Sequence, residues 1–150
     1  MRLSVVIPAH NEAGSIAETL DGITGALARE GVDYEVVVVD DASADDTAAV
    51  VAKVTERDAR VRCIRSPYPG GFGFAVRAGL DVYAGDAVAI VMADGSDSPT
   101  DLVAYHRVLM AGYDCAFGSR FIAGSRVYDY PRFKLGINRL VNLGIRLMFG

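Results

Sequence analysis

The chain has 150 residues and a formal net charge of −4, with 51% hydrophobic and 23% charged residues. This length suffices for one domain with its own core, and the composition is typical of a globular protein rather than a disordered one. A net negative charge gives no general attraction to nucleic acid, so we expect no nucleic-acid partner. Cys63 and Cys115 lack the spacing of a zinc site or a disulfide framework, which predicts free thiols in a reducing cytosol.

The sequence predicts neither a signal peptide nor a membrane span. The apolar run at residues 3–7 ends at Pro8 and is too short for a secretory core. A bilayer span needs about 18 consecutive apolar residues, and the sequence holds no such run. We therefore expect a cytoplasmic protein that is attached at most to the inner face of a membrane.

Apolar runs alternate with segments of helical spacing along the chain. The predicted strands are residues 3–7, 35–39, 61–64, 88–92 and 115–117. The predicted helices are residues 16–28, 45–57, 72–83 and 100–110. Continuous apolar strands separated by helices indicate a parallel sheet that is buried on both faces, with right-handed crossovers. The predicted fold class is therefore α/β, a mostly parallel sheet with helices on both faces, without internal repeats or an interdomain linker.

The predicted strand at residues 88–92 ends beside two acids, Asp94 and Asp97. In parallel sheets ligands bind beyond the carboxyl ends of the strands, so this buried strand would deliver the carboxylates to a binding edge. Carboxylate oxygens there can bind a hard divalent cation, and such a cation neutralises phosphates. The alternative is an acidic turn in which Asp97 or Ser98 only caps the next helix.

Polar residues also follow the first predicted strand. Pro8 fixes the direction in which the chain leaves the strand, and Asn11 and Glu12 then offer hydrogen-bonding groups. The alternative is a polar turn with Ser15 as the helix N-cap. His10 is predicted to be a surface residue rather than a metal ligand, because no second His or Cys lies near it in the sequence.

Asp40 and Asp41 follow the second predicted strand. Adjacent carboxylates repel each other, which is costly unless a cation or hydrogen-bond donors offset the repulsion. Ser43 can cap the next helix, and Asp45 and Asp46 favour its dipole, but neither effect explains the first pair. One acid of that pair accepting hydrogen bonds from a nucleobase or ribose is the functional interpretation.

A glycine-rich loop and an arginine complete the predicted edge. Gly71 and Gly73 allow close backbone approach, but Val76 stands where a dinucleotide fingerprint needs its third glycine, so a Rossmann dehydrogenase is poorly supported. Arg120 follows the last predicted strand, where it is either a phosphate ligand or a solvated surface residue. Acidic loops, a glycine loop and an arginine at one sheet edge together favour a site for phosphate and metal.

These motifs, in this order, resemble those of the family 2 glycosyltransferases of GT-A fold, close to the polyprenyl- and dolichol-phosphate sugar synthase branch. The segments that carry the resemblance are residues 5–12 (VVIPAHNE), 39–43 (VDDAS), 73–79 (GFAVRAG), 92–102 (MADGSDSPTDL) and 118–121 (GSRF). The second segment has Ala42 where the family pattern has glycine. The resemblance implies a nucleotide-sugar-binding fold and inverting transfer of a sugar from a nucleotide-sugar donor to a polyprenyl-phosphate acceptor, with Mg²⁺ or Mn²⁺.

The resemblance also implies roles for particular residues. The residues implied to hold the donor nucleotide are Pro8, Ala9, Asn11, Glu12, Gly73 and either Asp40 or Asp41. Asp94 would carry the metal bound to the diphosphate. Met92 replaces the first aspartate of the family's metal motif, so Asp97 is expected to restore the charge and share the metal. Arg120 and Lys134 would hold the acceptor phosphate, with Asn138 in place of a serine; Asp94, Asp97 and Arg120 are the predicted catalytic residues.

The resemblance further implies one GT-A domain over residues 1–150, with 1–118 binding the nucleotide sugar and 119–150 beginning the acceptor-binding part. Family members continue with another strand and further helices, so we expect the chain to lack the C-terminal part of the domain. Arg132, Arg139 and Arg146 recur every seven residues in an apolar tail. This pattern predicts either an amphipathic helix on anionic lipid or a helix packed on the protein with its arginines solvated.

Two other functions remain open at this point. A non-catalytic module that binds a nucleotide or lipid phosphate would explain why Met92 replaces a metal ligand. A nucleotidyltransferase shares the need for a nucleotide and a metal, but it usually has a glycine-rich loop with a basic residue after its first strand, which this sequence lacks. The sugar, the base of the nucleotide and the oligomeric state are also left open, as is the activity of these 150 residues on their own.

Overall fold

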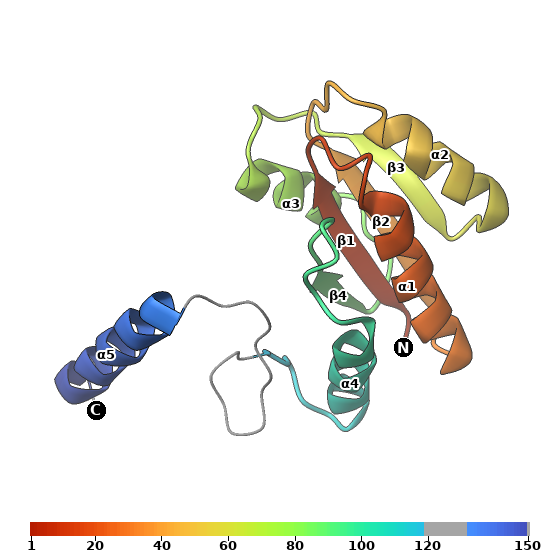
Figure 1. Cartoon of the computed structure of the whole chain (residues 1–150). Coiled ribbons are helices and arrows are strands. Elements are labelled where there is room, and N and C mark those ends of the chain that lie inside the picture. Colours follow the sequence, from red (N-terminus) through yellow and green to blue (C-terminus); the bar gives the residue numbers. More distant parts are fainter. Residues whose placement is uncertain (119–131, 150) are drawn as a thin grey trace. The chain divides into compact units, whose positions relative to one another are not determined.

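A computed structural model of the chain describes residues 1–118 and 132–149 (Figure 1). The chain divides into two compact units, Met1–Ala116 and Phe117–Gly150. The first unit contains a four-stranded sheet and the helices α1 to α4, and the second contains helix α5. The predicted acidic, glycine-rich and polar loops all belong to the first unit.

The sheet is parallel throughout, in the order β3-β2-β1-β4. Its strands are β1 (Leu3–Ala9), β2 (Tyr34–Asp40), β3 (Val61–Arg65) and β4 (Ala87–Ile90). Because β1 lies between β2 and β4, the loops that follow these three strands emerge side by side at the carboxyl edge of the sheet (Figure 1). The predicted α/β class and the parallel sheet are confirmed.

Helices pack on both faces of the sheet. They are α1 (Ile16–Arg29), α2 (Thr47–Arg57), α3 (Phe72–Leu80) and α4 (Pro99–Met110). Successive side chains of a strand point to opposite faces, so β1 feeds two separate cores. Val5 and Ile7 belong to the larger core, which includes buried residues of α1, α2 and α4, whereas Val6 packs with Ala75 and Ala78 of α3.

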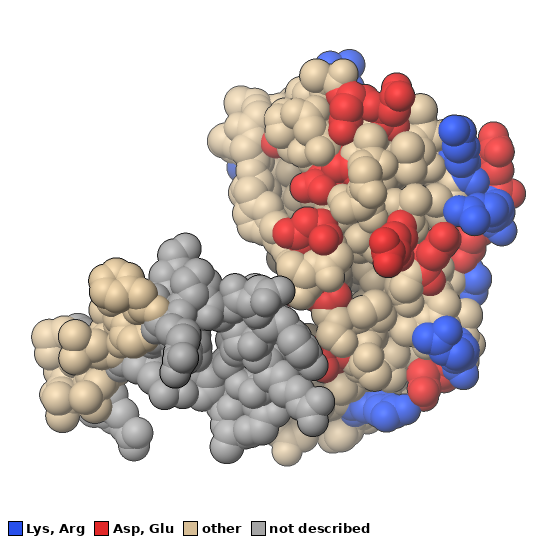
Figure 2. Space-filling view, in the orientation of Figure 1, with Lys and Arg blue, Asp and Glu red and all other residues tan. Residues whose placement is uncertain are grey.

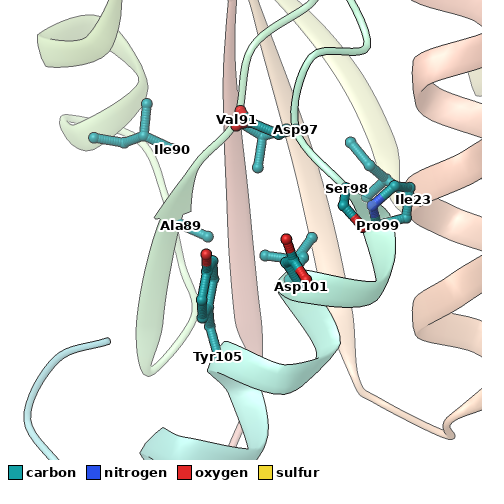
Figure 3. A pocket seen from close by; sticks show the side chains of 10 residues that line it. Ile23, Ala89, Ile90, Val91, Asp97, Ser98, Pro99, Asp101 and Tyr105 are labelled. Atoms are coloured by element: carbon teal, nitrogen blue, oxygen red, sulfur yellow. The ribbon is translucent and has the colours of Figure 1, made fainter. Parts of the chain in front are cut away.

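Strand β4 corrects one prediction. The apolar run at residues 88–92 was predicted to be a buried strand, but within the first unit only one of its faces is covered. Ala87 and Ala89 pack against the larger core, whereas Val88, Ile90 and Met92 are 37%, 48% and 38% exposed. Figure 3 shows Ile90 pointing to the opposite side of the strand from Ala89. An apolar run indicates a strand, but the run alone does not indicate whether another element covers each face.

Residues 115–117 were predicted to be a fifth strand, and this is wrong. The structure places no strand there; Cys115 is exposed, and Phe117 is 88% exposed. Three residues offer few ladder hydrogen bonds, and these side chains have no buried face to compensate.

Two helices are shorter than predicted. Helix α3 ends at Leu80 rather than near residue 83, because the N–H groups of Val82 and Tyr83 both donate to the Gly79 carbonyl in a closing turn. Helix α2 begins at Thr47 rather than at residue 45, because Asp45 is engaged in the loop before it.

The buried carboxylate of Glu35 binds several groups at the amino-terminal edge of the sheet. Glu35 is 5% exposed and accepts hydrogen bonds from Ser4 Oγ and from the Ala84 N–H, each at 2.6 Å. Arg62 and Arg2 lie 3.5 and 3.9 Å from its other oxygen. Burial raises the pKa of Glu35, but the hydrogen bonds from Ser4 and Ala84 and the two arginines outweigh it, so the pKa lies below its ordinary value of 4.5.

Glu35→Gln is expected to reduce the stability of the fold in a pH-dependent way. Because the pKa is lowered on folding, the contribution of the carboxylate is complete above its ordinary value of 4.5 and is lost as the pH falls through the lower, folded value. We expect the variant to lose about 1–3 kcal/mol of unfolding free energy at neutral pH, and the gap to wild type to narrow in acid. Urea denaturation at a series of pH values measures this gap. Glu56→Gln, at an exposed glutamate of α2, is the control, and a gap that does not change with pH would contradict the assignment.

The described element of the second unit is helix α5 (Arg132–Phe149). Large apolar side chains along it are exposed, including Phe133 at 81%, Leu140 at 70% and Leu147 at 79%. Within the described parts of the chain, none of the helices combines the length and apolar character required to cross a bilayer. Contact of α5 with lipid stays a prediction.

Candidate functional site

The loops after β1 and β2 are joined by a set of hydrogen bonds at the carboxyl edge. The Asn11 N–H donates to Ser43 Oγ at 3.0 Å, and the Ala44 N–H donates to Asn11 Oδ1 at 2.8 Å. Further along, the Glu12 N–H donates to Thr47 Oγ1 at 2.8 Å. These residues are more than thirty positions apart in sequence, so the bonds hold two separate loops as one rigid platform.

Asp45 contributes to the same platform. Its carboxylate accepts the N–H of Ala13 and the N–H of Thr47, each at 3.0 Å, and also the Thr47 hydroxyl. The Thr47 hydroxyl, with these backbone donors, holds the pKa of Asp45 below its ordinary value. The acid therefore stays ionised and joins the loop after β1 to the start of α2.

Backbone strain marks both loops. Asn11 and Ala42 have φ values of +58° and +55°, in the left-handed region that side-chain-bearing residues rarely adopt. Asparagine tolerates this conformation, and Asn11 gains the two bonds to the neighbouring loop. Alanine has no such compensation, and it occupies the position at which the family pattern has glycine.

Ala42→Gly is therefore expected to stabilise the protein. Relief of the left-handed conformation contributes about 1–2 kcal/mol, and the greater freedom of the unfolded glycine removes about 0.4–1 kcal/mol of this gain. We expect a net increase in unfolding free energy of roughly 0.5–1 kcal/mol, measured by urea denaturation. Ala44→Gly is the matched control, because Ala44 lies two positions away outside the positive-φ region. Equal destabilisation by both substitutions would contradict the strain at residue 42.

The adjacent acids Asp40 and Asp41 have different surroundings. Asp41 is 8% exposed, and its Oδ2 accepts the Gly71 N–H at 2.7 Å, which fixes the start of α3. Asp40 is half-buried at the rim, and its Oδ1 accepts the Ser43 N–H at 3.2 Å. Hydrogen-bond donors thus offset the repulsion between the two acids, and Asp40 is the more accessible of the pair.

His10 is exposed, as predicted, and forms hydrogen bonds at both ring nitrogens. Its Nδ1 lies 2.7 Å from the Asp41 carbonyl oxygen, and its Nε2 lies 3.1 Å from Asn11 Nδ2. The carbonyl only accepts and the amide nitrogen only donates, so these partners assign the neutral Nδ1–H tautomer. The His10 ring thus adds a hydrogen bond between the loops after β1 and β2.

The loop after β4 carries the other acids. Asp94 Oδ1 accepts the Ser96 N–H at 2.9 Å, and Asp97 Oδ2 accepts the Met92 N–H at 2.8 Å. Gly95 has a φ of +74°, which gives the tight turn between them. The alternative function for this turn was that Asp97 or Ser98 only caps α4. Ser98 is the N-cap residue, but its side chain forms no capping bond, and Asp97 precedes it.

Asp94 and Asp97 line a cleft of about 420 Å³. Its opposite wall is the first half of α1, including Ser15, Glu18 and Thr19. The acids after β2 do not line this cleft. Acidic side chains gather on the face of the first unit shown in Figure 2, with Lys and Arg mainly toward its right-hand side.

A smaller cavity of about 90 Å³ lies below the same loop, between β4, α1 and α4 (Figure 3). Asp97, Asp101 and Tyr105 are among its lining residues. Burial raises the pKa of Tyr105, and the charges of Asp101 and Asp97 raise it further, so the phenol stays protonated. Asp97 therefore lies in the wall between the cleft and the cavity.

The predicted nucleotide-binding residues differ in how much surface they present. Pro8 and Ala9 are buried in β1, where they pair with Val39 and Asp40 of β2. The Glu12 side chain accepts the Ser15 hydroxyl at 2.6 Å, and Gly73 is exposed on the first turn of α3 with open space around it.

The predicted acceptor-binding residues are not placed by the structure. Arg120 lies outside the described residues. Lys134 and Asn138 lie on α5, and their side chains are likewise outside the description.

Two residues that hold loops of the site in place were not predicted to do so: Thr47 bonds to the platform, and Thr19 bonds to the loop after β4. Thr47 and Thr19 are buried polar residues, 0% and 8% exposed, that bind other loops through their hydroxyl groups. A threonine on the apolar side of a predicted helix is a weak signal, because most such hydroxyls bond within their own helix.

The donor set limits how a metal can bind. Within the described residues, no group of three or more His, Cys, Asp or Glu side chains could hold a metal ion. The loop supplies two carboxylates, and Met92 offers only a thioether, which is a poor ligand for a hard cation. This set fits the mode of Mg²⁺ or Mn²⁺ in which one or two carboxylates act together with substrate phosphates and water.

Known proteins share this sequence and this fold. The model of the family described as glycosyl transferase family 2 matches residues 4–147. The chain is 32% identical to a dolichol-phosphate mannosyltransferase of Pyrococcus furiosus, over 93% of this chain and 39% of that protein. It is 33% identical to a polyprenol monophosphomannose synthase of Mycolicibacterium smegmatis, over 99% of this chain and 56% of that protein. The chain thus spans about half the length of these relatives or less.

A solved structure supports the same relationship. The glucosyl-3-phosphoglycerate synthase of Mycobacterium tuberculosis, in complex with Mn²⁺ and UDP-glucose, superposes with a TM-score of 0.62 and 27% identity. The match covers 74% of this chain and 40% of that one. Sequence and fold agree, and the chain belongs to glycosyl transferase family 2.

Proposed function

We propose that the protein transfers a sugar from a nucleotide-sugar donor to a polyprenyl-phosphate-type lipid acceptor, with inversion at the anomeric carbon. The observation that carries the proposal is the convergence of the loops after β1, β2 and β4 at one sheet edge in a family 2 glycosyltransferase. The names of the P. furiosus and M. smegmatis relatives supply the acceptor class.

The platform formed by the loops after β1 and β2 would hold the nucleotide. Asp40 is the better candidate of the acidic pair, because Asp41 is buried and bonded to Gly71. Asn11 and Glu12 would act mainly by keeping the platform rigid, since their polar groups bond to Ala44, Thr47 and Ser15. The nucleotide would contact the backbone of Pro8 and Ala9 and use the open space beside Gly73, because none of these residues carries a charge.

Asp94, with Asp97, would hold Mg²⁺ or Mn²⁺ against the donor diphosphate. Bound there, the cation supplies positive charge that stabilises the leaving nucleoside diphosphate. Because the described residues provide so few ligands, we expect metal and nucleotide to bind cooperatively. In the proposed reaction, an acceptor phosphate oxygen bonds to the anomeric carbon as the bond from that carbon to the diphosphate breaks. The acceptor phosphate is already ionised, so this step needs positioning more than a general base.

The acceptor side rests on the sequence pattern. Arg120 and Lys134 are proposed to bind the acceptor phosphate, with Asn138 beside them, because guanidinium and ammonium groups are strong phosphate ligands. A polyprenyl phosphate resides in a membrane, so we place the reaction at the inner face, with the protein bound peripherally.

One observation favours a second function, a non-catalytic nucleotide- or phosphate-binding module. Met92 is 38% exposed at the position of an expected metal ligand. If the methionine abolished metal binding, the platform could still hold a nucleotide without transfer.

A transfer assay tests the proposal. The protein is incubated with radiolabelled GDP-mannose or UDP-glucose, polyprenyl phosphate and Mn²⁺ or Mg²⁺, and label is counted in the organic phase. Label that depends on metal and on the lipid phosphate supports the transferase. Nucleotide binding without transfer to this or any other acceptor would overturn it and favour the binding module.

A further inference from the structure

We infer that Thr19 is a positioning residue that orients Asp94 from outside the acidic loop; the inference rests on the proposed role of Asp94 toward the donor diphosphate. Thr19 lies on α1, seventy-four positions before the loop residue that it contacts. Its Oγ1 donates to the Ala93 carbonyl at 2.9 Å, in a buried setting. Neither the motif pattern nor the family resemblance assigns a role to this residue.

The hydrogen bond from Thr19 acts on the peptide unit directly before Asp94. The Ala93 carbonyl belongs to the planar peptide unit that joins Ala93 to Asp94, so a fixed carbonyl fixes the plane on which Asp94 is mounted. Ala93 itself is 2% exposed, which anchors the preceding residue in the core. Asp94 is exposed and lines the cleft, so a rotation of the Ala93–Asp94 peptide would move the Asp94 carboxylate within the cleft.

Thr19 adds an anchor of a different kind from those inside the loop. The bonds from Met92 N–H to Asp97 and from Ser96 N–H to Asp94 close the loop on itself. The Thr19 bond connects it to α1, the opposite wall of the cleft. A Cβ at Gly95 would lie 3.5 Å from Thr19 Oγ1, so the turn packs directly against the hydroxyl.

A helix threonine commonly donates to a carbonyl of its own helix, and α1 contains a second such residue, Thr24, whose other polar neighbour is Tyr34 of β2 rather than the acidic loop. Thr24 Oγ1 donates to the Leu20 carbonyl at 2.9 Å, four residues earlier. Thr19 Oγ1 lies 3.1 Å from the Ser15 carbonyl oxygen and 2.9 Å from that of Ala93; a hydroxyl has one proton to donate, and the shorter contact is the one to Ala93. Thr24 is therefore a matched control for the loss of a helical threonine hydroxyl without loss of a loop anchor.

The test compares Thr19→Val, Thr19→Ser and Thr24→Val in the ligand-free protein and with nucleotide. Valine keeps the shape and removes the hydroxyl, and serine restores the hydroxyl. Hydrogen exchange at the Met92 and Ser96 amides reports on the loop without any ligand. Titration with GDP and with UDP, each with and without Mn²⁺, reports on the gain in nucleotide affinity that Mn²⁺ provides.

We expect Thr19→Val to accelerate exchange at these amides and to reduce the Mn²⁺-dependent gain in affinity on the order of 10-fold, as losses of groups that orient metal ligands do. Thr19→Ser should restore both, and Thr24→Val should change neither. Wild-type exchange at the loop in Thr19→Val, or failure of serine to rescue, would overturn the inference. Absence of any Mn²⁺-dependent nucleotide binding in wild type would contradict the proposed function, while the exchange data would still decide whether Thr19 anchors the loop.

Discussion

Asp94→Asn is expected to abolish the increase in nucleotide affinity that Mn²⁺ provides, a loss of about tenfold or more, equivalent to about 1.4 kcal/mol or more. Asparagine keeps the size of the side chain and an acceptor for the Ser96 N–H, but it removes the charge that a hard cation requires. Affinity without metal should be nearly unchanged, because the proposed nucleotide platform lies on the loops after β1 and β2. Calorimetric titration with GDP and with UDP, in Mn²⁺ and in EDTA, measures both quantities.

Two further variants make this result specific. Glu18→Gln removes a charge from the opposite wall of the same cleft and should leave the Mn²⁺ effect within about twofold of wild type. Asp97→Asn keeps an acceptor for the Met92 N–H while it removes the charge, so it separates closing of the loop from binding of the metal. A Glu18→Gln loss as large as that of Asp94→Asn would mean that the cleft attracts cations only through its total charge.

The largest effect on stability is expected at Gly79. A Cβ there would lie 2.3 Å from Val6 Cγ1, 3.1 Å from Val6 Cγ2 and 3.3 Å from Val39 Cγ2. Both valines are β-branched and fully buried in the sheet, so neither can rotate away. We expect Gly79→Ala to cost about 3 kcal/mol of unfolding free energy, and to lower the melting temperature by roughly 10 °C, because α3 must move off the sheet.

Gly73→Ala is the control on the same helix. A Cβ at Gly73 meets nothing within 4 Å, so the substitution should be neutral or slightly stabilising through helix propensity. In the Val6→Ala background, the cost of Gly79→Ala should shrink, because the atom that blocks the new Cβ is gone. An unchanged cost in that background would show that the contact between α3 and β1 is not the cause.

Much of the fold could be predicted from local patterns. Apolar, β-branched runs identified β1 to β4, and helical spacing identified α1 to α4, because both follow from how side chains alternate along an element. Coverage by other elements could not be predicted in this way. The partial exposure of Val88 and Ile90 on β4 and of Met92 just after it, and the absence of a strand at residues 115–117, both depend on what packs or pairs there within the described residues.

The candidate site was predicted in part, for the same physical reason. Parallel strands bring their carboxyl ends to one edge, so Asp40, Asp41, Asp94 and Asp97 could be assigned to that edge from sequence. The hydrogen-bond partners of these acids could not be predicted from sequence. The bond from the Gly71 N–H to Asp41, for example, joins residues thirty positions apart. The hydroxyl of Thr19 was missed because nothing in a helical pattern indicates a second acceptor on another element.

Paramagnetic broadening in the NMR spectrum tests directly whether this edge of the sheet binds a nucleoside diphosphate and a divalent cation together. Mn²⁺ is added to the ¹⁵N-labelled protein with GDP or UDP, and Mg²⁺ serves as the diamagnetic reference. We expect the strongest broadening at the amides of residues 94–97, weaker broadening at residues 10–13 and 41–44, and a clear reduction in Asp94→Asn. Broadening centred on the exposed acids of another surface, or unchanged by loss of the Asp94 charge, would contradict this expectation.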